Sequence, residues 1–94
     1  NLKVAVMELR LYARWVHSLK EKRMVVKSLL GKIRSRYAVS AAETAEQDIH
    51  QTIVIGVAAI VAHAAQADGL MDDILALVEN STEAEIVSVE RELR

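Results

Sequence analysis

Hydrophobic and polar residues first alternate along the chain. Between residues 2 and 12 one side of the alternation is apolar throughout, and it consists of Ala5, Met7, Leu9 and Leu11. A period of two residues is typical of a β-strand with one face against a core. The pattern therefore predicts a first strand over residues 2–12, followed by a connection that carries the only tryptophan, Trp15.

From Ser18 onward the hydrophobic period is that of a helix. The apolar residues recur at a spacing near 3.6 on one side, and they are Leu19, Val26, Leu29, Leu30 and Ile33. Ser18 and Glu21 have the spacing of a capping box, in which the serine accepts from an early N–H and the glutamate reaches back to the N–H of the cap. The pattern predicts a helix over Ser18–Arg36 that packs against a sheet. Gly31 is the one residue that does not suit it.

The rest of the chain predicts three further strands and a second helix. Tyr37–Thr44 is expected to be a short strand, and the polar Ala45–His50 a hairpin loop. Gln51–Ala62 is apolar on both faces, as in a central strand. Ala64–Asn80 predicts a helix with an acidic outer side, and Ala84–Leu93 alternates with charges, as in an edge strand.

The order β-α-β-β-α-β predicts an α+β protein with the ferredoxin-like plait, as a single domain over residues 1–94. Right-handed crossovers place both helices on one face of a four-stranded antiparallel sheet, with the strands in spatial order 4-1-3-2. The other face carries Val4 and Val6, and uncovered apolar surface of this kind marks an interface. We therefore expect a homo-oligomer, most simply a dimer.

Charge is distributed unevenly along the chain. The net charge of −1 combines +8 over residues 1–36 with −9 over residues 37–94. Cations on a rigid helix can neutralise several phosphates. The residues expected to bind nucleic acid are Arg10, Arg14, Lys20, Arg23, Lys27 and Arg34. Two alternatives remain open: a solvated helix face, or contact with an acidic surface of another protein or copy.

The chain contains no phenylalanine, and its few aromatic residues are expected at strand ends and in loops. Ferredoxin-like RNA binders stack bases on aromatic residues of the sheet. We therefore expect any RNA contact to involve phosphates or RNA shape. Trp15 has two interpretations: a lid over the end of the core, or an exposed anchor for a partner.

Signals for catalysis and cofactors are weak. Cysteine is absent, which excludes disulfides and thiolate chemistry. His17, His50 and His63 are scattered, and although Glu46, Asp48 and His50 could offer metal ligands, adjacent polar residues of a hairpin are usually only solvated. We expect no catalytic residues, no metal and no cofactor. The longest apolar run, Ile53–Ala62, is far shorter than the roughly 20 residues that span a bilayer, so we expect no membrane contact. The absence of cysteine fits a reducing cytosol, and we expect a cytoplasmic protein.

Three short motifs resemble one known family: Glu8–Leu11 (ELRL), Ser18–Arg23 (SLKEKR), and Gln47-Asp48 leading into Ile53–Val57. Together they are similar to the YlxP-like family of small bacterial proteins of unknown function, over essentially the whole chain. The resemblance implies a ferredoxin-like fold and no established activity. The family's gene lies, in some bacteria, among those for translation initiation and ribosome maturation, which implies RNA or a ribosome-associated partner.

The sequence as a whole therefore predicts a non-catalytic binding module that contacts RNA or a ribosome-associated protein through its basic helix. The alternative is a protein–protein interaction module, or a homo-oligomeric structural protein, that uses the open sheet face. Electrostatic attraction would then set the orientation of the copies, and apolar contact would supply affinity.

Overall fold

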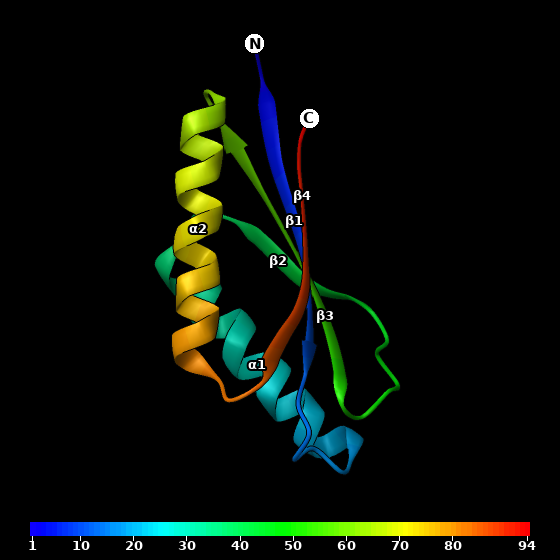
Figure 1. The fold of residues 1–94 in the computed structure, drawn as a ribbon. Helices are drawn as coiled ribbons and strands as arrows, with labels where there is room; N and C mark the ends of the chain where they lie inside the picture. The colour runs from blue at the N-terminus through cyan, green and yellow to red at the C-terminus, as the bar shows by residue number, and fades with distance from the viewer.

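The computed structural model describes residues 1–94 as one antiparallel sheet with two helices packed against one of its faces (Figure 1). The elements along the chain are β1 (Lys3–Tyr12), α1 (Leu19–Arg36), β2 (Ser40–Ala45), β3 (Thr52–Val61), α2 (Ala64–Ser81) and β4 (Glu85–Leu93). The four strands lie in the order β2-β3-β1-β4. This arrangement confirms the predicted ferredoxin-like α+β fold, its strand order and the central position of the two most apolar strands.

The core lies between the sheet and the helix layer. The strict alternation of β1 points Met7, Leu9 and Leu11 into it, and Met7 pairs with Val57 of β3 across the centre of the sheet. The helices contribute one stripe each. The buried members of these stripes are Val26, Leu29, Leu30 and Ile33 of α1 and Ala67, Met71, Ile74 and Val78 of α2. Leu19, at the first position of α1, is only half-buried.

β2 begins later than the sequence pattern indicated. The prediction of a strand over Tyr37–Thr44 is wrong at both ends, because β2 spans Ser40–Ala45. Tyr37 still belongs to the end of α1, since its N–H donates to the carbonyl of Ile33 at 3.0 Å. At the other end, the register shifts between Glu43 and Ala45, so a bulge carries the strand past Thr44.

The face of the sheet away from the helices is divided into an apolar and a polar half. Val4 pairs with Ile60, whose side chain is 72% exposed, while Val4 and Val6 are themselves half-buried. Farther along β1 the residues that point to this face are Glu8 and Arg10. The expectation that Val4 and Val6 lie open to solvent is therefore only partly right, because Ile60 carries most of the exposed area.

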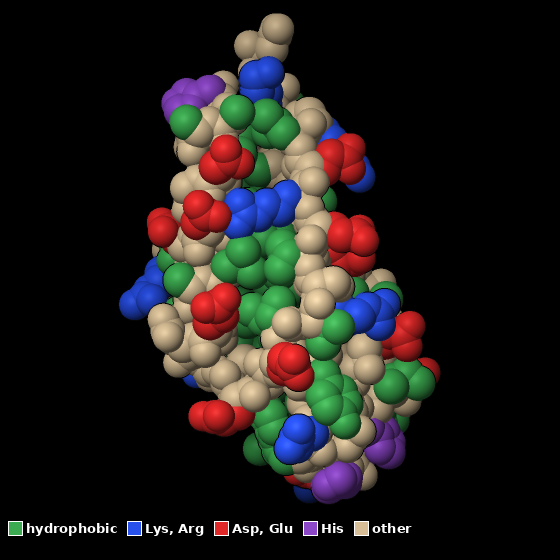
Figure 2. All heavy atoms as spheres, viewed as in Figure 1, with side chains coloured by type: hydrophobic (Ala, Val, Ile, Leu, Met, Phe, Trp, Pro, Cys, Tyr) green, Lys and Arg blue, Asp and Glu red, His purple; other side chains and the backbone are tan.

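The two halves of the chain interleave in the sheet but separate in the helix layer. β1, from the basic half, lies between β3 and β4 of the acidic half. α1 and α2 remain basic and acidic respectively, and Figure 2 shows acidic side chains on both sides of an apolar strip between α2 and β4. The exposed carboxylates of α2 and β4 include Asp68, Asp72, Asp73, Glu90 and Glu92. Neither helix combines the length and apolar character needed to cross a membrane.

Gly56 of β3 allows two strands to be linked across it. It pairs with Glu8 of β1 on one side and Ala42 of β2 on the other. Thr44 Oγ1 donates to Glu8 Oε2 at 2.9 Å, and a Cβ at Gly56 would lie 2.6 Å from Thr44 Cγ2. Because real Cβ atoms do not approach so closely, any other residue at this position must displace the threonine.

We expect Gly56→Ala to lower the free energy of unfolding by about 1–3 kcal/mol, the usual effect of overpacking. In a chain that already carries Thr44→Ala the same substitution should cost much less, since the obstructing methyl group is gone. Urea unfolding of the four variants of this cycle measures the coupling. An equal loss in both backgrounds would show that Thr44 does not limit the space at Gly56.

Candidate functional site

The start of α1 is fixed by its cap. Ser18 Oγ accepts from the N–H of Glu21 at 3.1 Å, as the sequence predicted. The sequence also predicted a hydrogen bond from the N–H of Ser18 to the side chain of Glu21. In the structure the donor is the preceding residue, since Glu21 Oε1 accepts from the N–H of His17 at 3.2 Å. The only carboxylate of α1 is therefore engaged at its first turn, and every other charge on the helix is positive.

Three of the predicted binding residues form one exposed surface, here called the basic face: Lys20, Arg23 and Lys27. At 100° per residue they project within about 60° of one another. The three ion pairs of the structure are Lys22–Glu43, Arg91–Asp72 and Arg94–Glu92, so no cation of the basic face has a carboxylate partner. These charges are free to interact with an external anion.

Gly31 lies one helical turn beyond Lys27, next to the basic face. Its position is exposed, and no atom lies within 4 Å of the place where a Cβ would stand. The glycine is therefore not explained by a close approach within the chain. Its effect is to leave a shallow depression of about 600 Å³ on the helix, whose rim includes Lys27 and Lys32.

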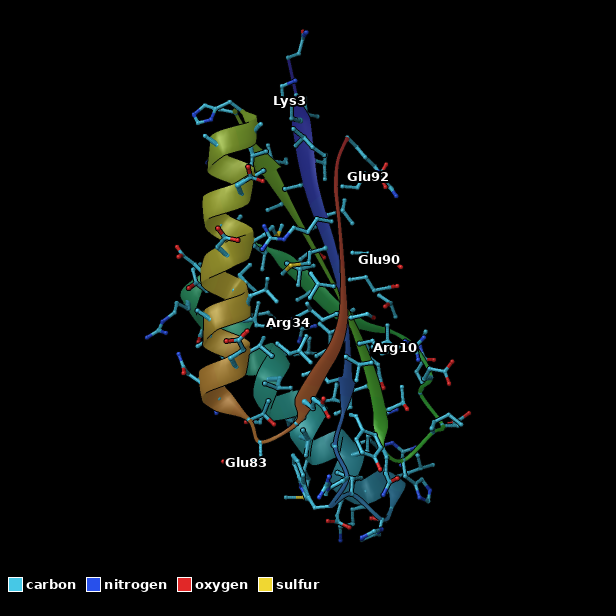
Figure 3. The ribbon with its side chains drawn as sticks, in the orientation of Figure 1. Lys3, Arg10, Arg34, Glu83, Glu90 and Glu92 are labelled. Atoms are coloured by element: carbon cyan, nitrogen blue, oxygen red, sulfur yellow. The ribbon has the colours of Figure 1, made fainter.

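Arg34 has a structural contact as well as an exposed charge. Its Nη2 donates to the main-chain carbonyl of Ala41 in β2, so this side chain ties α1 to the edge of the sheet. Figure 3 shows Arg34 on the helix side of the sheet and Arg10 on the other side. Replacing Arg34 would disturb packing as well as charge.

Arg10 and Arg14 do not join the basic face. Arg10 points to the open face of the sheet together with Glu8, so the sheet itself separates it from α1. Arg14 is exposed in the connection after β1, where its carbonyl accepts from Gln51 Nε2 at 2.8 Å. Although Arg10 is close to the end of β1, its side chain points away from the helices.

Lys22 was not singled out by the sequence analysis, although its side chain is only 1% exposed. Its Nζ lies 3.1 Å from Glu43 Oε2 and donates to the carbonyl of Glu46. The contact with Glu43 is an ion pair without aligned hydrogen-bond geometry, because Glu43 Oε2 has no hydrogen-bond partner. A helical projection does give a signal, since it places Lys22 between Leu29 and Ile33 on the apolar stripe.

This buried cation holds the start of the β2–β3 hairpin. Glu46 has a φ of 58°, in the left-handed region that non-glycine residues seldom adopt. Its carbonyl accepts from Lys22 and also from the N–H of Ile49, at 3.0 Å. The hairpin is thereby connected to the first turn of α1.

The histidines lie in different environments. His63 caps α2, and its Nδ1 accepts from the N–H of Gln66 at 3.2 Å. His17 and His50 border one shallow hollow of about 550 Å³ beside the hairpin, together with Asp48. No group of three or more histidine or carboxylate side chains stands close enough to hold a metal ion.

Glu92 and Arg94, at the end of the chain, shift each other's pKa. A hydrogen bond from Arg94 to Glu92, 3.2 Å long, lowers the pKa of the Glu92 carboxyl and raises that of the Arg94 guanidinium. Both side chains are exposed, so the pair is a surface contact without a role at the basic face.

Comparison with known proteins establishes the family. A family model described as a protein of unknown function (DUF503) matches residues 4–91. The chain belongs to the DUF503 family. "Uncharacterized protein YlxP" of Bacillus subtilis is 34% identical to this DUF503 protein over 68 residues, which cover 72% of this chain and 74% of the relative. The resemblance carried by the ELRL and SLKEKR motifs is thus confirmed.

Structural comparison supports the fold alone. The solved structure named "De novo designed protein Foldit4" matches this DUF503 protein with a TM-score of 0.56 and 14% sequence identity. The match covers 100% of this chain and 97% of the designed one.

We expect Lys22→Met to lower the free energy of unfolding by about 3 kcal/mol, because Glu43 would keep a largely buried charge without a partner. The double variant Lys22→Met/Glu43→Leu should recover most of that loss, since it removes both charges. Urea unfolding monitored by Trp15 fluorescence provides the measurement.

Arg91→Met is the matched control, because it breaks the solvent-exposed pair with Asp72. That change should cost no more than about 1 kcal/mol. Equal losses for Lys22→Met and Arg91→Met would contradict a special role for the buried pair.

Proposed function

We propose that this DUF503 protein binds RNA through α1, with the basic face contacting backbone phosphates. The observation that carries the proposal is the unpaired state of Lys20, Arg23 and Lys27 on one side of a helix whose other side is buried. With a rise of about 1.5 Å per residue, Lys20 and Lys27 stand about 10 Å apart along the helix axis. A rigid row of cations at this scale suits the phosphate backbone of a folded RNA.

The other surfaces are poor candidates for a polyanion. The open sheet face, where ferredoxin-like RNA binders stack bases, carries Glu8 on β1 and Glu90 and Glu92 on the neighbouring strand. Figure 3 shows Glu90 and Glu92 pointing to the same side as Arg10, away from the helices. Because α2 is acidic as well, the charge pattern favours α1 as the side that meets RNA.

The test replaces the basic face with neutral side chains and measures binding of a short RNA hairpin by fluorescence anisotropy. Lys20→Gln/Arg23→Gln/Lys27→Gln should reduce affinity at least tenfold and lower the slope of log affinity against log salt, because fewer counterions are released. Arg34 is left intact because it holds β2.

The control is Lys3→Gln/Arg91→Gln/Arg94→Gln, which removes the same charge from positions outside α1. It should retain nearly all RNA affinity. Equal losses in both triple variants would mean that net charge alone, and not α1, governs binding. Absence of RNA binding by the unmodified protein would overturn the proposal.

Two variants of Gly31 that differ only in charge test whether the depression at this residue contacts RNA. Gly31→Glu and Gly31→Gln both fit without a clash and have similar helix propensity. Only the glutamate should weaken RNA binding, since it places a negative charge beside Lys27 and Lys32. Identical binding by the two variants would exclude the depression at Gly31 from the interface.

A second candidate function is self-association through the apolar half of the open sheet face. Ile60 is 72% exposed beside Val4, and Val6 pairs with Ala58 next to them, so a two-fold contact would cover this area. The proposed partner is a second copy of the same chain. This surface is distinct from the basic face, and both functions can coexist.

We expect Ile60→Glu to convert a dimer to a monomer of about 10 kDa in light scattering at micromolar concentration, because it buries a charge in the contact. Val87→Glu is the control, since it also changes an exposed apolar side chain, but on β4. A monomeric unmodified protein, or loss of mass with Val87→Glu alone, would show that the sheet face does not mediate association.

A further inference from the structure

We infer that a hollow beside α1, built around Trp15, receives one unpaired nucleobase of the bound RNA. This inference rests on the proposed function and specifies the kind of RNA: a folded RNA with an unstacked nucleotide next to its phosphate contacts. The hollow has a volume of about 340 Å³ and lies where α1 meets the end of α2.

Half of the residues that line the hollow are apolar, and one of these is aromatic. Trp15, Met24, Val25 and Leu29 line it, and the first two are unusually open for their size, at 38% and 66% exposed. Trp15 is therefore neither a fully buried lid over the core nor a fully exposed anchor, since part of its ring is covered and part faces solvent. An exposed aromatic ring offers a stacking surface for any base.

The hollow adjoins the shallow depression at Gly31 on α1. Met24 and Ser28 line both the hollow and the shallow depression that holds Lys27 and Lys32. A phosphate held by these lysines would therefore leave its own or a neighbouring base within reach of Trp15. This charge complementarity favours a nucleotide over an apolar peptide as the occupant.

Glu83 adds a means of selecting the base. It lies on the rim of the hollow, at the turn between α2 and β4 (Figure 3). A carboxylate accepts hydrogen bonds and donates none, so it pairs with the exocyclic amino group of cytosine, guanine or adenine. Uracil has no amino group, and the carbonyl oxygens on either side of its N3–H repel a carboxylate. Its neighbour Thr82 is already engaged, accepting from the N–H of Ala84 at 3.1 Å.

The experiment compares two RNA hairpins that differ only by one bulged cytidine. The bulged hairpin should bind about tenfold more tightly, the order expected for one stacked base. It should also quench the fluorescence of Trp15, which is the only tryptophan. The blunt hairpin should bind through the basic face with little quenching.

Two variants at Trp15 and one at Glu83 complete the design. Trp15→Ala should lose the tenfold advantage of the bulged hairpin while binding the blunt one as before. Trp15→Phe should retain part of the advantage, which separates stacking from any loss of fold. Glu83→Gln should reduce the preference for a bulged cytidine over a bulged uridine.

The outcomes separate the two proposals. If both hairpins bind with equal affinity and Trp15 fluorescence does not change, the nucleobase inference is overturned while RNA binding by α1 stands. If a Trp15→Ala protein keeps the full advantage, the inference falls in the same way. If neither hairpin binds the unmodified protein, the proposed function itself has failed.

Discussion

The burial of one stripe of α1 against the sheet is the constraint on which the surface of this protein depends. Leu29 and Ile33 enter the core, and the helix cannot rotate without exposing them. Burying a side chain of this kind is worth about 1.5–3 kcal/mol. The orientation of every charge on α1 follows from that packing, so the basic face depends on the core as much as on its own two lysines and one arginine.

The same packing places a charged residue, Lys22, on the buried stripe of α1. A cation on a buried stripe must find compensation, and Glu43 with the Glu46 carbonyl supplies it. The compensation comes from β2 and the following loop, which are distant in sequence. A pair of this kind often adds little net stability, but it fixes which groups face each other. In this protein it couples the position of the hairpin to the first turn of α1.

The sequence predicted the fold because its patterns are local. Strict alternation in β1, the Ser18 cap and the order of elements are all contained in short windows. Two predictions were wrong or incomplete although a local pattern indicated the outcome. Arg10 was grouped with α1, although its own alternation assigned it to the opposite face. Lys22 was passed over because lysine is rarely buried. The hollow at Trp15 depends on the end of α2, and no local pattern could place that segment beside it.

The main-chain bonds between Val4 and Arg94 have a practical consequence for handling the protein. Each residue donates its N–H to the carbonyl of the other, at 2.7 and 2.8 Å, so the two termini lie side by side at one end of the sheet. Figure 1 shows that this end is opposite to the start of α1. An affinity tag or fluorescent fusion at either terminus would stand clear of Trp15. A short peptide joining the termini would permit circular permutation, with new ends opened in the hairpin loop and α1 left intact.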